Sequence, residues 1–145
     1  MRLDEILDEW DKDCVINDNQ LGEASIVSAK LHSKYLRHLI DTKGKKTKLE
    51  SEYQVLRKSK FRYYRGEMTK KELDERGWEQ YQYTKPLKNE MDEILKGDDD
   101  VVKIQMKLDY LDTMIYALES IMAQIKARDW QIKNGIDFKK FLAGG

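Results

Sequence analysis

Two series of apolar residues recur with a seven-residue period in the last third of this chain. One series contains Val101, Leu108, Ile115 and Met122, and the other, offset by three positions, contains Ile104, Leu111, Leu118 and Ile125. This spacing predicts one long amphipathic helix. Met114 and Ile121 widen its apolar stripe beyond the narrow seam of a two-stranded coiled coil. The stripe is therefore either the core of an intramolecular bundle or an interface between subunits. We favour a mixture of the two, because the chain has few other long apolar faces to cover it.

The rest of the chain also has helical character. Leu3, Ile6, Leu7 and Trp10 predict a short helix that ends near Asp11–Asp13, and Asn17 to Gln20 provide N-cap residues for a second helix. The apolar face of this second helix contains Leu21, Ala24, Ser28, Leu31, Tyr35 and Leu39. Asp98 to Asp100 are expected to cap the heptad helix. The fold class predicted is all-α, with long amphipathic helices and a C-terminal heptad helix packing in a helical oligomer.

Glycine, proline and threonine predict where the helices end. Gly44 is a candidate interruption of the second helix, and Gly66 a candidate C-cap. Thr69 to Glu72 matches a capping box, and Pro86 suits the first turn of a helix that ends at Gly97. We expect one helical domain over residues 1–145. Its N-terminal part, 1–97, carries a basic block at 43–71, and its C-terminal part, 98–145, provides core packing and oligomerisation.

The formal net charge of zero conceals strong segregation of charge along the sequence. Residues 43–71 contain eleven Lys or Arg and three Glu, a charge of +8. The flanking acidic segments, 1–20 and 72–100, carry −5 and −6. Because the Debye length is about 8 Å at physiological salt, distant acids do not neutralise the basic block. Its partner should therefore be anionic.

Several function classes lack their characteristic motifs. The sequence has no phosphate-binding or dinucleotide-binding glycine loop, no H-E-x-x-H motif and no nucleophile elbow. His32 and His38 are isolated, so we expect no metal site, no cofactor and no catalytic residues. There is no apolar run long enough to span a membrane. The lone Cys14 fits a reducing compartment, so a soluble, intracellular binding protein is predicted.

The stretch Val55 to Lys71, "VLRKSKFRYYRGEMTKK", combines basic residues with two adjacent tyrosines. Single-stranded nucleic acid is bound by cations that follow the phosphates and by aromatic faces that stack on bases. On a helix, Lys58, Arg62 and Arg65 share one side, whereas Lys60 lies roughly opposite, with Leu56 and Tyr63. Tyr63 is therefore expected to pack, and Tyr64 is the better candidate for stacking. The alternative is that the basic side is only a solvated face.

Three segments resemble the UvsY family of recombination mediators from T4-type phages. They are the acidic opening "MRLDEILDEWDKDCVIND", the central "KSKFRYYRG" and the closing "IKARDWQIKNGIDFKKFLAGG". The resemblance follows the same order over nearly the full length. Arg62 stands where an acidic residue is expected in the family. The region from Lys70 to Lys96 matches poorly, so the resemblance implies nothing there.

The resemblance implies a non-enzymatic protein that binds single-stranded DNA as a ring-like homo-oligomer, a hexamer or heptamer. It would help load a UvsX-type, RecA-like recombinase onto strands covered by the phage single-strand-binding protein, in the cytoplasm of the host cell. The DNA-binding bases of the family correspond to Lys58 and Lys60. Together with the basic block, the full set of expected DNA-binding residues is Lys45, Lys46, Lys48, Arg57, Lys58, Lys60, Arg62, Tyr64, Arg65, Lys70 and Lys71.

Self-assembly in the family involves the C-terminal region, which corresponds here to the heptad helix and the tail. The expected interface residues are Ile104, Leu108, Leu111, Met114, Ile115, Leu118, Ile121, Met122, Ile125, Phe138 and Phe141. An alternative function is a helical coiled-coil scaffold whose basic face docks an acidic protein. A regulator that binds duplex DNA is a weaker possibility, because no base-reading helix-turn-helix is evident.

Overall fold

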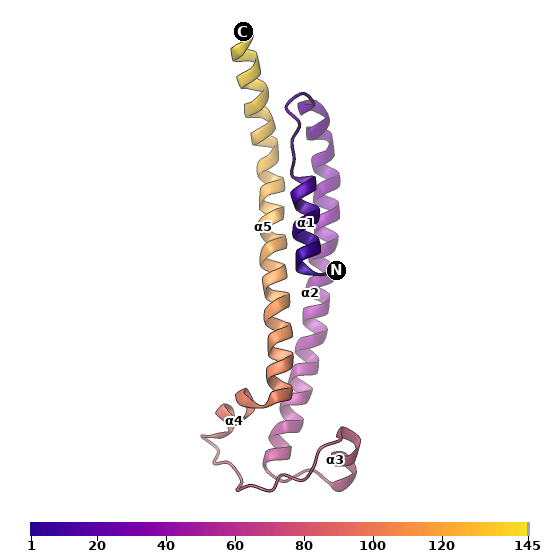
Figure 1. The fold of residues 1–145 in the computed structure, drawn as a ribbon, viewed down its shortest axis with the longest axis vertical. Coiled ribbons are helices and arrows are strands. Elements are labelled where there is room, and N and C mark those ends of the chain that lie inside the picture. Colours follow the sequence, from indigo (N-terminus) through magenta and orange to yellow (C-terminus); the bar gives the residue numbers. More distant parts are fainter. Residues whose placement is uncertain (145) are drawn as a thin grey trace. The chain divides into compact units, whose positions relative to one another are not determined.

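The computed structural model of the chain describes residues 1–144, and all of its regular elements are α-helices. These are α1 (Leu3–Asp13), α2 (Leu21–Tyr64), α3 (Lys70–Arg76), α4 (Met91–Gly97) and α5 (Asp99–Leu142) (Figure 1). The all-α prediction is confirmed. None of the helices in the described part of the chain is both long and apolar enough to cross a membrane.

The chain divides into two compact units. The first, here called the apolar unit, contains Met1–Gly44 and the described residues from Leu111 onward. The second, here called the charged unit, contains Lys45–Tyr110. The long helices α2 and α5 each contribute residues to both units, whereas α1 belongs to the first and α3 and α4 belong to the second.

In the apolar unit, α1 packs with the N-terminal part of α2 and the C-terminal part of α5. The core is formed almost entirely by hydrocarbon and aromatic side chains: Ile6, Leu31, Tyr35, Met114, Leu118, Ile121 and Ile125. Trp10 meets the Tyr35 ring edge-on, with 5.4 Å between the ring centroids. The predicted apolar faces of α1 and α2 therefore form one core, as expected from their helical spacing.

The end of α1 is fixed by polar contacts inside this unit. The Tyr35 hydroxyl donates to Asp13 Oδ2 at 2.8 Å, and the Lys34 ammonium donates to the same oxygen at 2.5 Å. Burial raises the pKa of the Tyr35 hydroxyl, and its bond to Asp13 raises that pKa further. The buried Arg128 guanidinium donates to the Cys14 carbonyl oxygen at 3.2 Å, where a cation suits the C-terminal end of a helix.

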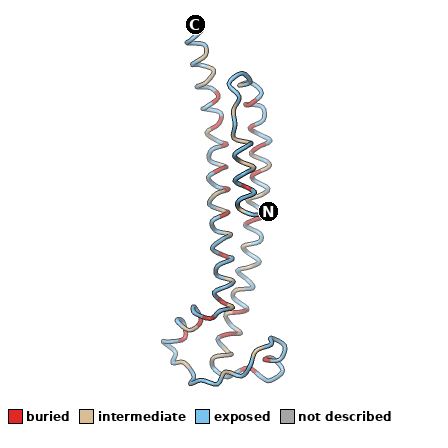
Figure 2. The backbone as a smooth tube through the Cα atoms, in the orientation of Figure 1, coloured by how far each residue is buried: buried red, intermediate tan, exposed pale blue. Residues whose placement is uncertain are grey.

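The burial pattern of α5 departs from strict heptads. Buried positions recur along the length of α5 (Figure 2). Val101 and Leu108 are buried at the first series of positions, but further along Met114 and Ile121 are more buried than Ile115 and Met122. In the apolar unit, the side chains of α5 pack with Ile6 of α1 as well as with Leu31 and Tyr35 of α2. The two residues that widened the stripe in the sequence therefore become core residues there.

The helix boundaries confirm most of the sequence predictions, with two exceptions. Gly66 ends α2 with φ +68°, Thr69 and Glu72 form the capping box of α3, and Asp98 caps α5. The possible break at Gly44 is wrong, because α2 runs through it. A single helical glycine costs only about 1 kcal/mol, which packing on either side offsets.

The predicted helix start at Pro86 is also wrong, because α4 begins at Met91. The Glu90 amide instead donates to the Leu87 carbonyl oxygen at 2.9 Å, which closes a turn. The helix forms only where Met91 and Leu95, one turn apart, bury their side chains.

Candidate nucleic-acid interface

The basic block lies on the C-terminal half of α2 and on the start of α3, and all of it from Lys45 onward belongs to the charged unit. Five of its lysines are exposed and form no ion pair with any described residue: Lys45, Lys48, Lys58, Lys70 and Lys71. Ammonium groups without a carboxylate partner keep their full charge available for phosphates. These five residues provide the accessible part of the predicted basic surface.

Other cations of the block are partly exposed but paired. Arg57 contacts Asp92 at 2.9 Å, Arg65 contacts Glu67 at 2.8 Å, and Lys46 contacts Glu50 at 3.6 Å. Surface pairs of this kind contribute little to stability and exchange readily for another anion. Contacts from these three residues to DNA remain a prediction.

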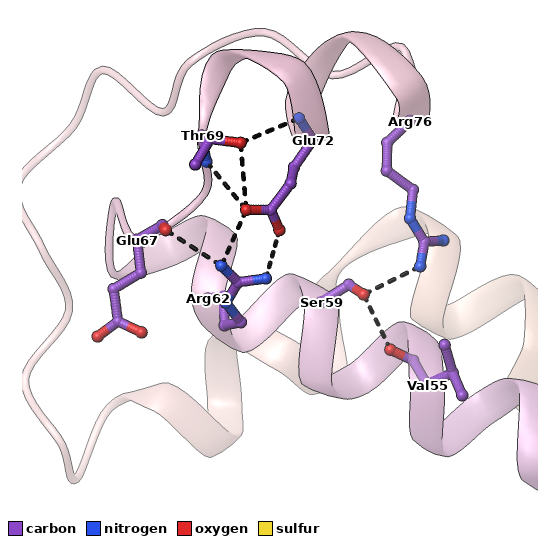
Figure 3. A network of polar contacts seen from close by, with 7 residues as sticks. All are labelled: Val55, Ser59, Arg62, Glu67, Thr69, Glu72 and Arg76. Atoms are coloured by element: carbon purple, nitrogen blue, oxygen red, sulfur yellow. Dashed lines mark hydrogen bonds and ion pairs between the residues drawn. The ribbon is translucent and has the colours of Figure 1, made fainter.

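Arg62 has a different position, because it holds the start of α3 against α2 (Figure 3). Its guanidinium forms a two-point contact with the Glu72 carboxylate and also donates to the Glu67 carbonyl oxygen at 3.3 Å. The bond from Arg62, followed by the bond from the Thr69 amide, lowers the pKa of Glu72 to about 2. Arg62 thus completes the capping box from outside, which favours a positioning role over phosphate binding.

Next to it, Arg76 on α3 donates to the Ser59 hydroxyl oxygen at 3.0 Å, while Ser59 donates to the Val55 carbonyl oxygen one turn back. These contacts fix α3 on the side of α2 that carries Val55 and Ser59.

Lys60 is buried, in contrast to its neighbour Lys58. Its side chain is 8% exposed, and its ammonium lies 3.2 Å from Asp98 Oδ2 and 2.9 Å from Asp100 Oδ2. The same nitrogen is 4.1 Å from the centroid of the Trp78 ring, which adds a cation–π contact. A phosphate could reach this ammonium only by displacing two carboxylates and an indole. We therefore revise the proposed role of Lys60 from DNA contact to internal ion pair.

Asp98 connects this ion pair to the second tyrosine. The Tyr64 hydroxyl donates to Asp98 Oδ2 at 2.6 Å, and the other carboxylate oxygen accepts the Val101 amide at 3.2 Å. Burial alone would raise the pKa of Asp98, but the bonds from Tyr64, Val101 and Lys60 outweigh it and lower the pKa. Burial and Asp98 together raise the pKa of the Tyr64 hydroxyl.

The two tyrosines belong to an aromatic cluster that the sequence did not reveal. Tyr63 and Tyr64 both meet the ring of Tyr81 edge-on, at centroid distances of 5.7 and 5.0 Å, and Tyr63 also meets Trp78 at 5.5 Å. The packing predicted for Tyr63 agrees with this arrangement. Tyr64 is half-buried among these rings and anchored by its hydroxyl, so it is poorly placed to stack on a base.

The aromatic partners of the two tyrosines, which the sequence did not predict, lie in the irregular segment between α3 and α4. Trp78 and Tyr81 have no helical or strand periodicity around them, so no pattern indicated which way they point. The only sign was the aromatic richness of residues 76–86 itself. Tyr83, at the end of the cluster, is 80% exposed.

A groove lies beside Lys58 on the surface of the charged unit. We call it the α2–α4 groove; it has a volume of about 390 Å³ and is lined by Gln54, Arg57, Lys58, Phe61, Lys88, Met91, Asp92 and Leu95. Three of these residues are basic and one is acidic. The groove therefore combines positive charge with one partly exposed aromatic ring.

The predicted interface residues of α5 fall into two groups. Leu108, Met114, Leu118, Ile121 and Ile125 are buried within the chain, whereas Ile104, Leu111, Ile115 and Met122 are half-buried. Phe138 and Phe141 are 60% and 76% exposed. Much of the apolar stripe of α5 is thus buried within one subunit. A role of its half-buried and exposed residues in self-assembly stays a prediction.

Comparison with known proteins decides the family. The family model described as "Recombination, repair and ssDNA binding protein UvsY" matches residues 9–145. This chain belongs to the UvsY family. The resemblance inferred from the sequence is therefore confirmed, and the chain is grouped with recombination mediators.

The UvsY protein of phage T4 is similar to this chain over nearly its full length. The chain is 28% identical to the recombination protein UvsY of Enterobacteria phage T4 over 144 residues, which cover 99% of both proteins. It superposes on a crystal structure of the bacteriophage T4 recombination mediator protein UvsY with a TM-score of 0.86 and 26% identity, covering 99% of this chain and 98% of that one. A second crystal form of the T4 protein gives a TM-score of 0.80 at 25% identity, covering 97% and 98%.

Proposed function

We propose that this UvsY-family protein binds single-stranded DNA as an oligomer. We further propose that it promotes loading of a RecA-like recombinase onto strands covered by single-strand-binding protein. The observation that carries the proposal is the set of five exposed, unpaired lysines on α2 and α3, on a chain whose family is described as binding single-stranded DNA. The protein acts by binding and not by catalysing a reaction.

Weak contacts from one subunit become strong when subunits assemble. One basic block offers only a few phosphate contacts, each sensitive to salt. An oligomer presents the same block several times, so one strand held by one subunit meets the next block at high effective concentration. A UvsX-type recombinase and the phage single-strand-binding protein are the expected protein partners.

Charge reversal at Lys58 tests the DNA-binding part of the proposal. We expect Lys58→Glu to weaken binding of a labelled oligo-dT by about tenfold or more and to reduce the salt dependence of binding. Fluorescence anisotropy over a series of salt concentrations measures both quantities. Lys107→Glu is the matched control, because it makes the same change of charge at an exposed lysine of the same unit outside the basic block.

Lys60 is unsuitable for this test, because its reversal would place three carboxylates together inside the unit. Mass measurement with and without oligonucleotide shows whether Lys58→Glu still assembles. Unchanged affinity and salt dependence in a Lys45, Lys48 and Lys58 triple reversal would exclude this surface as the DNA site. Recombinase loading is followed separately, as filament formation on DNA precoated with single-strand-binding protein.

A further inference from the structure

The α2–α4 groove has the features of a pocket for one nucleobase. We propose that a base of single-stranded DNA inserts into this groove and stacks on Phe61, while Lys58 and Lys88 hold the phosphates on either side of it. This inference rests on the proposed DNA-binding function. It assigns a role to Phe61 and Lys88, neither of which was among the residues predicted from the sequence.

The apolar surface of the groove suits a flat aromatic ligand. Phe61 is 38% exposed although it lies on the same helix as the packed Tyr63 and Tyr64. Met91 and Leu95, which are 4% and 1% exposed, provide a fixed wall from α4. A volume of about 390 Å³ lies within the range of roughly 300–1,000 Å³ typical of small-ligand pockets.

The rim of the groove suits an anionic chain. Arg57 and Asp92 pair with each other at 2.9 Å, so the single acid on the rim is already neutralised. Lys58 and Lys88 are exposed and form no ion pair with any described residue, which leaves two free ammonium groups beside the groove. An apolar floor with free cations at its edge binds a base and its phosphates together.

The Arg65 guanidinium extends this surface. Its central carbon lies 5.5 Å from the centroid of the Phe61 ring, four residues further along the chain and just past the end of α2. Guanidinium planes also stack on bases, so Arg65 provides a second face next to Phe61.

The other aromatic rings of the unit fit this role less well. Tyr63, Tyr64 and Tyr81 contact each other edge-to-face, and the Tyr64 hydroxyl is bonded to Asp98. Tyr83 is more exposed than Phe61 but does not line the α2–α4 groove. Phe61 combines exposure, a place in this groove and neighbouring positive charge.

The test compares two oligonucleotides of equal length, one of normal oligo-dT and one with abasic sites throughout. Both carry the same phosphates, but only the first can stack. We expect Phe61→Leu to weaken binding of oligo-dT by about five- to tenfold and to leave binding of the abasic strand unchanged. Phe61→Tyr should retain the affinity of the unaltered protein. Lys88→Gln should weaken binding of both strands, with a smaller salt slope.

Tyr83→Leu is the matched control for loss of an exposed ring in the same unit, and should bind both strands normally. Far-ultraviolet circular dichroism and mass measurement establish that each variant is folded and assembled. The groove assignment is overturned if Phe61→Leu loses the same affinity for both strands or loses none. It is also overturned if Tyr83→Leu loses as much affinity as Phe61→Leu. If the triple reversal of Lys45, Lys48 and Lys58 also binds DNA normally, the wider assignment of this surface to DNA fails; if only Phe61→Leu does, the stacking site alone fails. Preference of the groove for an acidic peptide over oligo-dT, seen as competition, would likewise overturn the assignment.

Discussion

The cores of the two compact units differ in the chemistry of their buried side chains. The apolar unit buries Ile6, Leu31, Leu118 and their neighbours, with polar contacts mainly around Asp13 at the end of α1. The charged unit instead buries an ammonium and a carboxylate, Lys60 and Asp98, among aromatic rings. Both units bury hydrocarbon side chains, such as Leu73 and Leu95 in the charged unit, but the charged unit adds a buried ammonium–carboxylate pair to its core.

This difference explains why two nearby lysines have unlike roles. An apolar core tolerates exchange between side chains of similar volume, whereas a buried charge requires each of its partners. Lys60 has its partners inside the protein, in Asp98 and Asp100. Lys58, two residues earlier on the same helix, is exposed and remains available to a ligand.

The largest expected effect is a charge in the apolar core. Leu118 is 0% exposed, and in Leu118→Asp the new carboxylate has no buried basic partner among the core residues. Burying an unpaired charge costs more than the free energy of unfolding of a small domain, so we expect loss of folded protein. Circular dichroism and light scattering measure this. The exposed Tyr116→Asp, on the same helix, is the control and should fold. A folded Leu118→Asp protein would show that this core is not as described.

The next effect concerns the ion pair of the charged unit. Lys60→Met keeps an unbranched side chain out to Cε but removes the ammonium group, which leaves Asp98 without that partner. We expect the free energy of unfolding to fall by about 2–4 kcal/mol, since breaking a buried pair leaves an uncompensated charge. Urea unfolding measures it. The same variant should retain the salt dependence of DNA binding, in contrast to Lys58→Gln. A large decrease in the salt dependence of Lys60→Met would show that Lys60 contacts DNA.

Lowering the pH is expected to have a smaller effect on the stability of the charged unit. The folded pKa of Glu72, about 2, lies below its ordinary value of 4.5. The unfolded state therefore binds a proton first, and the contribution of Glu72 is complete above pH 4.5 and is lost as the pH falls toward 2. The lowered pKa of Asp98 acts in the same direction.

Trp78 fluorescence, in a protein with Trp10→Phe and Trp130→Phe, follows the charged unit alone. Its unfolding midpoint in urea should decrease between pH 4.5 and 2, and Glu72→Gln should reduce this pH dependence. Equal pH dependence with and without Glu72 would contradict the role of the Arg62–Glu72 contact.

The smallest predicted effect is a gain in stability. A Cβ atom at Gly44 would meet nothing within 4 Å, and the residue lies inside α2 with helical geometry. Gly44→Ala should therefore stabilise the protein by about 1 kcal/mol. Thermal unfolding measures the gain. Gly66→Ala should do the opposite, because φ is +68° there.

Local sequence determined much of this protein. Apolar spacing located α1, α2 and α5, and side-chain caps located the start of α3 and α5, because these features depend on residues three or four positions apart. The family could also be inferred from short motifs and their order. The sign of the basic block followed from counting charges over 43–71.

Tertiary structure alone decided which basic residues face solvent. Lys58 and Lys60 lie two positions apart in the same basic motif, and the sequence already placed Lys60 beside Leu56 and Tyr63. Its burial, however, depends on Asp98, Asp100 and Trp78, which are 18 or more positions away in sequence and meet it only when the charged unit folds. The α2–α4 groove has the same origin, since Phe61 and Lys88 come from different elements. Periodicity describes one helix at a time, whereas burial of a charge depends on the segments that pack around it.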